Sequence, residues 1–357
     1  MNQRRERAGS RPPLEPNLND LPDLAPIDWS SIGATAPKLV DTPVNDLTPA
    51  DVVIITWTSA EWAAMNHVFT ASDQSLDPYH YTDDWPGWQR YTRDMPDIEG
   101  WYEWGSYRLV EMNGEKVMLF KSNTHLDWPD DGKQLAPLVA RIVKYVKPRL
   151  VLSIGTAGGA RITDPLGTVN VVNAGTLYDS RESADAWPTY RSRWEPCWQA
   201  VERVEALTQP IPVNQKDLQS LANQFNAYYE TLYSLDELNP DNLNLPEGKP
   251  ALNNLAVSGI PLLTTSTFVV GTTDGKYNDF ACIEMDDAVI FKTIVDSGED
   301  ILFGSARNLS DPVQNASLPA WVQSSWGSLI YKAYGLYTSF GGALTAWATV
   351  NGFLNPR

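Results

Sequence analysis

The chain has 357 residues, of which 43% are hydrophobic and 20% charged, which is typical of a globular protein with one large or two ordinary domains. Acidic residues number 44 against 27 Lys and Arg, and the formal net charge of -17 disfavours nucleic-acid binding as the main function. Only two cysteines and 3 histidines are present, so we expect no disulfide framework, no metal site and no cofactor.

The N-terminal region is rich in Pro, Asn and Asp, with arginines clustered first. It has no apolar signal core, and no run in the chain approaches the roughly 18 apolar residues of a membrane span. We therefore expect a cytoplasmic protein that does not bind membranes. Residues 1–47 are predicted to form a mobile arm; a tail that is ordered only against a neighbouring subunit is the alternative.

Strands and helices alternate from residue 51 onward. Short apolar runs predict buried strands, and apolar residues at helical spacing predict helices that cover them. In the first half of the chain we expect strand 52–55, a helix over 60–69 that Thr58 or Ser59 caps, strands 107–110 and 116–120 about an Asn113-Gly114 turn, helix 135–146 and strand 150–154.

The second half continues this pattern, so the fold class is α/β. We expect strand 169–172, an amphipathic helix through Leu218 to Leu232, strands resuming at 262, helix 285–295, strand 301–303 and two helical stretches, 329–337 and 343–353. One domain over 48–357 is predicted. It carries insertions at about 79–104, which looks irregular, and at 178–250.

Several predicted strands end in distinctive loops, and the carboxyl ends of strands are where open α/β sheets bind ligands. The glycine turn at 155–159 alone is a weak signal, because it lacks both the Rossmann spacing and the P-loop lysine. The order of the loops along the chain is more informative. The loops lie at 58–61, 155–159, 266–271, 284–286 and 307–311.

The sequences around these loops resemble the nucleoside phosphorylase/nucleosidase superfamily, most of all the methylthioadenosine/S-adenosylhomocysteine nucleosidases. The matching segments are DVVIITWTSAEW, VLSIGTAGGARITDPLGTVNVVNAG, TSTFVVGT, CIEMDDAVI and ARNLSDP, within about 51–355. The resemblance implies a mixed central sheet with flanking helices, a small-molecule nucleoside or nucleotide as ligand, and a homo-oligomer in which a second subunit often completes the pocket.

Cleavage of an N-ribosidic bond builds positive charge on the sugar and negative charge on the leaving base, so two carboxylates in contrasting environments can divide the work. The resemblance implies that Asp311 protonates purine N7, which needs a raised pKa and a dry pocket. It implies that Glu61 activates water. Glu61 falls in the first turn of a predicted helix, where the dipole favours an anion.

The sugar and the base would meet residues from the other loops. By resemblance, Met285 lies beneath the ribose beside Glu284, and Asp286 replaces a glutamate that bonds the ribose hydroxyls. The aspartate is one methylene shorter. His125 is either close to the 5′ side of a ligand or a solvated loop histidine. The remaining residues implied in substrate binding are Phe268, which stacks on the base, Val269, which reads its edge, Thr156, Ala157 and Gly158 at the floor, and Arg307, which orients a carboxylate and the water.

Hydrolysis is favoured over phosphorolysis because the cations that hold phosphate are missing. Ser153 stands where hexameric phosphorylases have an arginine, and the first loop contains no arginine. We predict hydrolysis of a purine (adenine-type) nucleoside or nucleotide with release of free base. The alternatives are a phosphate-dependent phosphorylase, a non-catalytic binding or storage protein on the same fold, and a nucleotide-depleting effector whose extra segments serve a sensor partner.

Overall fold

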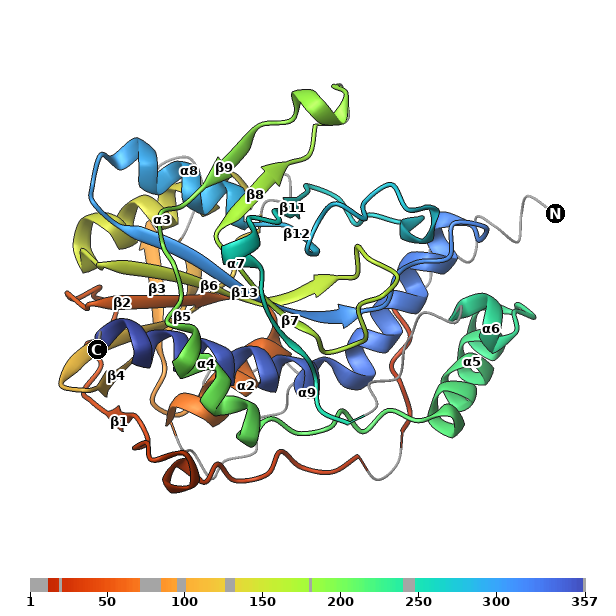
Figure 1. Cartoon of the computed structure of the whole chain (residues 1–357), viewed down its shortest axis with the longest axis horizontal. Coiled ribbons are helices and arrows are strands. Elements are labelled where there is room, and N and C mark those ends of the chain that lie inside the picture. Colours follow the sequence, from red (N-terminus) through yellow and green to blue (C-terminus); the bar gives the residue numbers. More distant parts are fainter. Residues whose placement is uncertain are drawn as a thin grey trace.

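The computed structural model describes residues 12–18, 21–70, 85–94, 101–125, 132–179, 182–239 and 248–355. Within these residues, thirteen strands join one mixed sheet, and helices cover both of its faces (Figure 1). The predicted α/β class with a mixed central sheet is confirmed. No helix in the described part of the chain is long and apolar enough to cross a membrane.

Five strands form the centre of the sheet. β2 (Val52–Thr56) pairs in parallel with both β5 (Glu115–Ser122) and β6 (Leu150–Gly158). β6 also pairs in parallel with β13 (Leu302–Asp311), and β13 pairs antiparallel with β7 (Val169–Val172). Because β2, β5, β6 and β13 run in the same direction, their carboxyl ends meet at one edge of the sheet.

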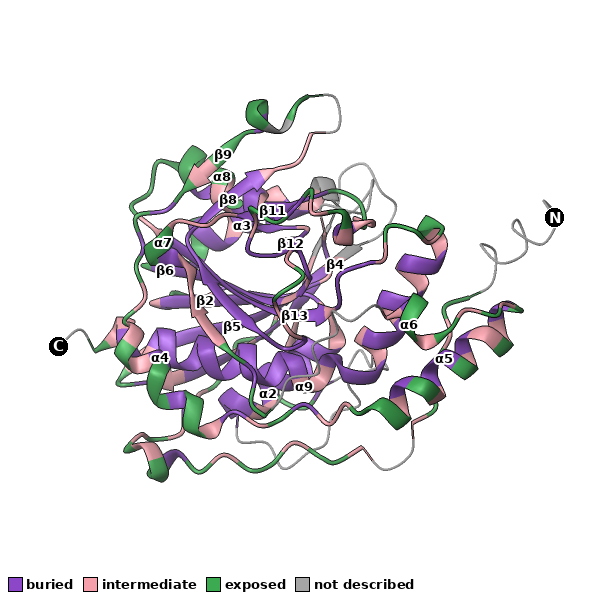
Figure 2. Cartoon of the chain, turned by 45° about the vertical axis from the view of Figure 1, so that its right-hand side comes forward, coloured by how far each residue is buried: buried purple, intermediate pink, exposed green. Residues whose placement is uncertain are grey.

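Apolar side chains of β2 alternate between the two faces of the sheet, as the period of a strand requires. Ile54 belongs to a core cluster with residues of α2 (Ser59–Thr70) and α9 (Ala320–Leu354). Ile55 belongs to a second cluster with residues of α3 (Gly132–Val146) and α8 (Asp287–Ser297). Figure 2 shows that the sheet and the helix faces against it are buried.

The segment predicted to be irregular, 79–104, contributes to the sheet. β4 (Trp101–Met112) pairs antiparallel with β5 across the predicted turn, and β3 (Gln89–Asp94) pairs antiparallel with β4. Tyr91 and Trp104 are buried here against the core. The irregular interpretation was therefore wrong in this part, because these aromatic residues pack as strand residues. β1 (Lys38–Leu39) pairs with the outer side of β4.

A second branch of the sheet leaves β6 at its end. The single register pair Ile283–Gly158 joins β12 (Ile283–Glu284) to β6, so the residues after β12 lie beside the glycine turn. The branch continues through β11 (Leu262–Thr264), β8 (Ala174–Leu177) and β9 (Thr189–Arg191), while β10 (Leu252–Asn254) pairs with β7. The short remaining elements are η1 (Trp29–Ile32), η2 (Ala184–Ala186), α4 (Trp198–Val204), η3 (Glu205–Leu207), α6 (Leu235–Leu238), α7 (Leu255–Ser258) and η4 (Thr272–Asp274).

The two predicted C-terminal stretches are one helix, α9. Gly341-Gly342 lies between the two predicted stretches, and glycine weakens helices. In the fold, a Cβ on Gly342 would stand 2.6 Å from Asn308 Oδ1 on β13. The glycine therefore allows the helix to pack closely on the sheet and does not end it.

The periphery differs from expectation at one further point. The amphipathic helix is α5 (Gln215–Tyr229), which Glu230 ends in a left-handed conformation, so Leu232 lies outside it and is 97% exposed. Part of the predicted arm runs beside this helix: Asn17 N donates to Gln224 Oε1 at 2.8 Å, and Tyr228 Oη donates to Pro12 O at 3.0 Å. Whether 1–47 and the insertions are separate units stays a prediction.

Candidate active site

A cavity of about 280 Å³ lies where the ends of β2, β6, β12 and β13 meet α9. Every residue that the sequence predicted for the site lines it. These residues are Glu61, Thr156, Ala157, Gly158, Phe268, Val269, Glu284, Met285, Asp286, Arg307 and Asp311. The structure thus brings together side chains that are up to 250 positions apart, from Glu61 to Asp311. Their roles remain proposals.

The Glu61 carboxylate is buried and accepts five hydrogen bonds. Oε2 accepts from Thr56 Oγ1 at 2.7 Å and from the backbone N–H groups of Trp57 and Thr58, each at 2.8 Å. Oε1 accepts from the amide and the hydroxyl of Thr156, both at 2.6 Å. Burial raises the pKa of Glu61, but these hydrogen bonds outweigh burial and lower the pKa below its usual value. Glu61 is an anion.

The surroundings of Asp311 shift its pKa in the opposite direction from that of Glu61. Its side chain lies at the end of β13, beside Gly158 and within reach of Phe268 and Gly327, and the hydroxyl of Ser310 donates to its Oδ1 at 2.7 Å. Burial raises the pKa of Asp311 to about 7, and the hydrogen bond from Ser310 offsets only part of this effect. Asp311 therefore gains and loses its proton near neutral pH, whereas an ordinary aspartate is fully ionised there.

Arg307 is fully buried and is engaged by side chains of the protein. Its Nη2 donates to Glu284 Oε2 at 3.0 Å, to Ser153 Oγ at 2.7 Å and, at short range, to Asp287 Oδ1. Its Nε donates to Asp287 Oδ2 at 3.3 Å, and the guanidinium carbon lies 5.0 Å from the Trp57 ring centroid. Arg307 thus contacts two buried carboxylates, and its predicted role of orienting a carboxylate and a water stays a prediction.

Gly155 brings this buried cluster next to Glu61. A Cβ on Gly155 would stand 2.8 Å from Glu61 Oε1 and 3.0 Å from Arg307 Nη1. The backbone can pass between the carboxylate and the guanidinium only because the residue is glycine. The glycine of the turn therefore serves close packing between two functional side chains.

Glu284 stabilises the loop that leads into α8. Its Oε2 accepts from the backbone N–H of Asp286 at 2.7 Å and of Asp287 at 3.0 Å, while Thr264 Oγ1 donates to Oε1. Burial and the neighbouring Asp287 carboxylate raise the pKa of Glu284 to about 8, although Arg307 acts in the other direction. These contacts fix the backbone that presents Met285 and Asp286 to the cavity.

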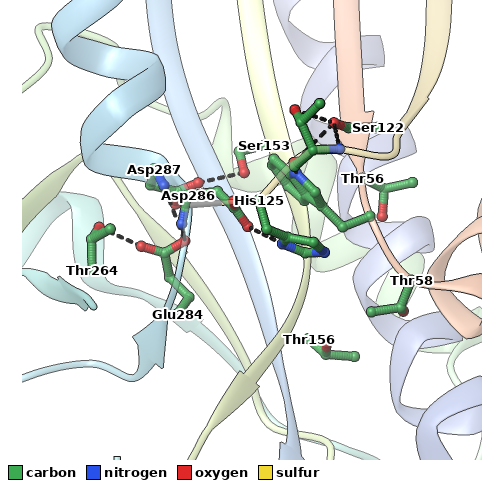
Figure 3. Close-up of polar contacts among 12 residues, drawn as sticks. Thr56, Thr58, Ser122, His125, Ser153, Thr156, Thr264, Glu284, Asp286 and Asp287 are labelled. Carbon is green, nitrogen blue, oxygen red and sulfur yellow. Dashed lines mark hydrogen bonds and ion pairs between the residues drawn. The ribbon is translucent and has the colours of Figure 1, made fainter. Parts of the chain in front are cut away.

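His125 belongs to this site although it was not among the predicted site residues. Its Nδ1 lies 3.2 Å from Asp286 Oδ2, and the two side chains point at each other (Figure 3). The side chains are 21% and 4% exposed, so this is an ion pair at the wall of the cavity when the imidazole carries a proton. The only sequence signal was a histidine after a strand end.

Phe268 also lines the cavity and is 40% exposed. Sequence reasoning missed the part of the wall that α9 supplies through Ser324, Ser328 and Tyr331. Their spacing of four and three residues places them on one face of the helix. Polar residues at this spacing in an otherwise apolar helix were the available signal.

The charge of the cavity is dominated by carboxylates. Among the lining residues only Arg307 and His125 are basic. Arg307 is engaged by Asp287 and Glu284, and His125 faces Asp286. The described residues contain no group of three or more His, Cys, Asp or Glu side chains placed to hold a metal ion.

No protein-family model matches the chain, and no curated protein gives a significant match. Among solved structures it is similar to 5′-methylthioadenosine/S-adenosylhomocysteine nucleosidase from Neisseria meningitidis in complex with methylthio-immucillin-A (12% identity, 85% of this chain and 99% of that one, TM-score 0.48). It is also similar to futalosine hydrolase of Helicobacter pylori (8% identity, 85% and 98% covered, TM-score 0.46).

A third similar structure is the methylthioadenosine/S-adenosylhomocysteine nucleosidase from S. pneumoniae with a transition-state inhibitor (13% identity, 85% of this chain and 99% of that one, TM-score 0.46). All three proteins are nucleoside-cleaving enzymes by name. Their identities with this chain are low, and the chemistry of the cavity has to be derived from its own residues.

Proposed function

We propose that this protein hydrolyses the N-ribosidic bond of a purine (adenine-type) nucleoside or nucleotide and releases the free base. The observation that carries the proposal is the contrast between two carboxyl groups of one cavity: the pKa of Glu61 is lowered, and that of Asp311 is raised to about 7. Carboxyl groups whose pKa values are shifted in opposite directions are the arrangement that acid–base catalysis at neutral pH requires.

Asp311 is the proposed acid. A purine that leaves the sugar accumulates negative charge, and a proton on N7 neutralises it. Phe268 supports the base from the side of its ring face, and Asp311 lies close to that ring, since both surround Gly327. The aspartate at this position accommodates an adenine with its 6-amino group.

Glu61 is the proposed base for water. Its lowered pKa makes it a weak base towards bulk water, but a water molecule that attacks a cationic sugar becomes strongly acidic as the bond forms. An anion held by five hydrogen bonds then both orients this water and stabilises the positive charge of the sugar.

Water is favoured over phosphate as the nucleophile because the described cavity offers little to bind an oxyanion. Ser153 bonds to Asp287 at 2.5 Å and accepts from Arg307, so this position supports the buried cluster. A non-catalytic binding protein would gain nothing from a buried Asp311 with a pKa near 7, which is costly to the fold. The predicted homo-oligomer and sensor partner stay predictions.

The test is incubation of the protein with a panel of purine nucleosides and nucleotides, with and without phosphate, followed by chromatography for free base. We expect base and free ribose, at a rate that phosphate leaves unchanged. Asp311→Asn is the matched control for contaminating activity. A strict requirement for phosphate would replace the hydrolase by a phosphorylase, and no base release with any substrate would contradict the proposal.

A further inference from the structure

Asp286 and His125 form a pair that no part of the proposed chemistry uses. His125 follows β5, and Asp286 precedes α8, 161 positions later in the chain. Both side chains line the cavity, and Nδ1 lies 3.2 Å from Oδ2. The contact therefore joins two loops at the wall of the cavity.

The backbone before His125 is fixed, so the imidazole is held in place. Trp57 Nε1 donates to Thr124 O at 2.9 Å, and Thr124 N donates to Ser122 Oγ at 3.0 Å. Thr124 and Ser122 are both fully buried. A short segment anchored in this way positions its next side chain before any ligand arrives.

Among the described residues, the charged groups that affect His125 are Asp286 before α8, Glu61 on α2 and Lys121 on β5. Burial and Lys121 lower the pKa of His125, but the two carboxylates outweigh them and raise it above its usual value. Below this raised pKa the imidazole is protonated, and its Nδ1–H donates a charge-assisted hydrogen bond to the Asp286 carboxylate.

We infer that His125 is a positioning residue that fixes the Asp286 carboxylate towards a sugar hydroxyl, so that the two residues together select ribose over 2′-deoxyribose. This inference rests on the proposed function. Removal of the imidazole would take a charge-assisted contact away from an aspartate that is only 4% exposed.

The experiment compares a purine ribonucleoside with its 2′-deoxy analogue in wild type, His125→Ala, His125→Asn and His67→Gln. In His125→Asn the amide can donate a hydrogen bond from nearly the position of Nδ1. His67 is the control histidine: it lies on α2 outside the cavity, where it contacts Ala25 O. We expect His125→Ala to lower the ribo-to-deoxy ratio of kcat/KM by roughly 10- to 100-fold, mainly through KM for the ribonucleoside. His125→Asn should restore part of the ratio, and His67→Gln should keep it.

The pH profile separates this role from a merely structural one. The wild-type ratio should fall as pH rises through the raised pKa of His125, because the charge-assisted hydrogen bond is lost; the protonation of Asp311 affects both substrates and cancels in the ratio. His125→Asn should give a flat ratio. An unchanged ratio in His125→Ala, or the same pH profile in His125→Asn, overturns the inference.

Calorimetry distinguishes failure of this inference from failure of the proposed function. If wild type releases no base, the hydrolase proposal fails. The role of His125 and Asp286 would still be supported if wild type binds the ribonucleoside more tightly than its 2′-deoxy analogue and His125→Ala abolishes that difference. Equal affinity of wild type for both nucleosides, or binding of neither, overturns the inference whatever the catalytic result.

Discussion

Thr156 donates two hydrogen bonds of 2.6 Å to the same oxygen of Glu61, one from its amide and one from its hydroxyl. The amide bond ties the carboxylate to the strand that carries the glycine turn, and the hydroxyl bond adds to the stabilisation of the anion. The hydroxyl can be removed without touching the backbone, which makes the pKa of Glu61 adjustable by one substitution.

Thr156→Val should move the acid limb of the pH–rate profile to higher pH. Glu61 must be ionised to act, so activity is lost as pH falls through its pKa, and loss of the hydroxyl bond raises that pKa. Thr156→Ser, which keeps the hydroxyl, should move the limb less. The measurement is kcat/KM against pH for all three proteins, and coincident acid limbs would show that Thr156 does not control Glu61.

Asp311→Asn should lower kcat for a purine nucleoside by roughly 100- to 10,000-fold, which is the usual contribution of a catalytic acid. The basic limb of the wild-type profile should lie near the raised pKa of about 7, because activity is lost as Asp311 gives up its proton. A riboside with a nitrophenolate leaving group needs no protonation, so the variant should retain far more activity towards it. Equal losses on both substrates would argue against the acid role.

The same substitution should stabilise the fold at alkaline pH. A carboxyl group whose folded pKa is raised binds its proton more tightly in the native state, so its contribution to stability declines as pH rises through the folded pKa of about 7. Asp311→Asn removes this dependence. Thermal unfolding at about pH 5 and about pH 8 should show the variant gaining stability over wild type mainly at the higher pH. A pH-independent difference would mean that Asp311 is not protonated in the native protein.

Gly155→Ala should abolish activity and destabilise the protein, because the new methyl group would stand 2.8 Å from Glu61 Oε1 and 3.0 Å from Arg307 Nη1. Gly33→Ala is the control: its φ is +65°, and no atom lies within 4 Å of the added Cβ. The control should lose about 1 kcal/mol of stability and keep its activity. Normal turnover in Gly155→Ala would show that the two side chains can separate at no cost.

The sequence predicted best those elements whose own residues indicate their burial. The apolar runs of β2 and β6 are buried on both faces, and such strands read as continuous hydrophobic segments. Glu61, Thr156 and Asp311 converged because they lie at or just after the ends of the parallel strands β2, β6 and β13. Glu284 reaches the same edge from β12, which pairs antiparallel with the end of β6. The continuity of α9 was not predicted: Gly342 packs against Asn308, which lies on another element, and local sequence does not show this contact.

The partners within the site could not be predicted for a similar reason. Asp286 and Asp287 are neighbours in sequence, yet one lines the cavity and the other is fully buried against Ser305 and Arg307. Nothing local distinguishes two adjacent aspartates at the start of a helix. His125 was ambiguous for the same reason, since its partner lies 161 positions away.

The helix that forms one wall of the cavity is also the place where the start of the chain attaches. Lys332, next to Tyr331, forms an ion pair with Glu15 and approaches Leu14 O at 3.5 Å, and Tyr337 Oη donates to Pro22 O at 2.8 Å. Removal of residues 12–25 would therefore expose the back of a helix that lines the cavity. Kinetic constants from a preparation that lacks these residues should be read beside those of the chain that contains them.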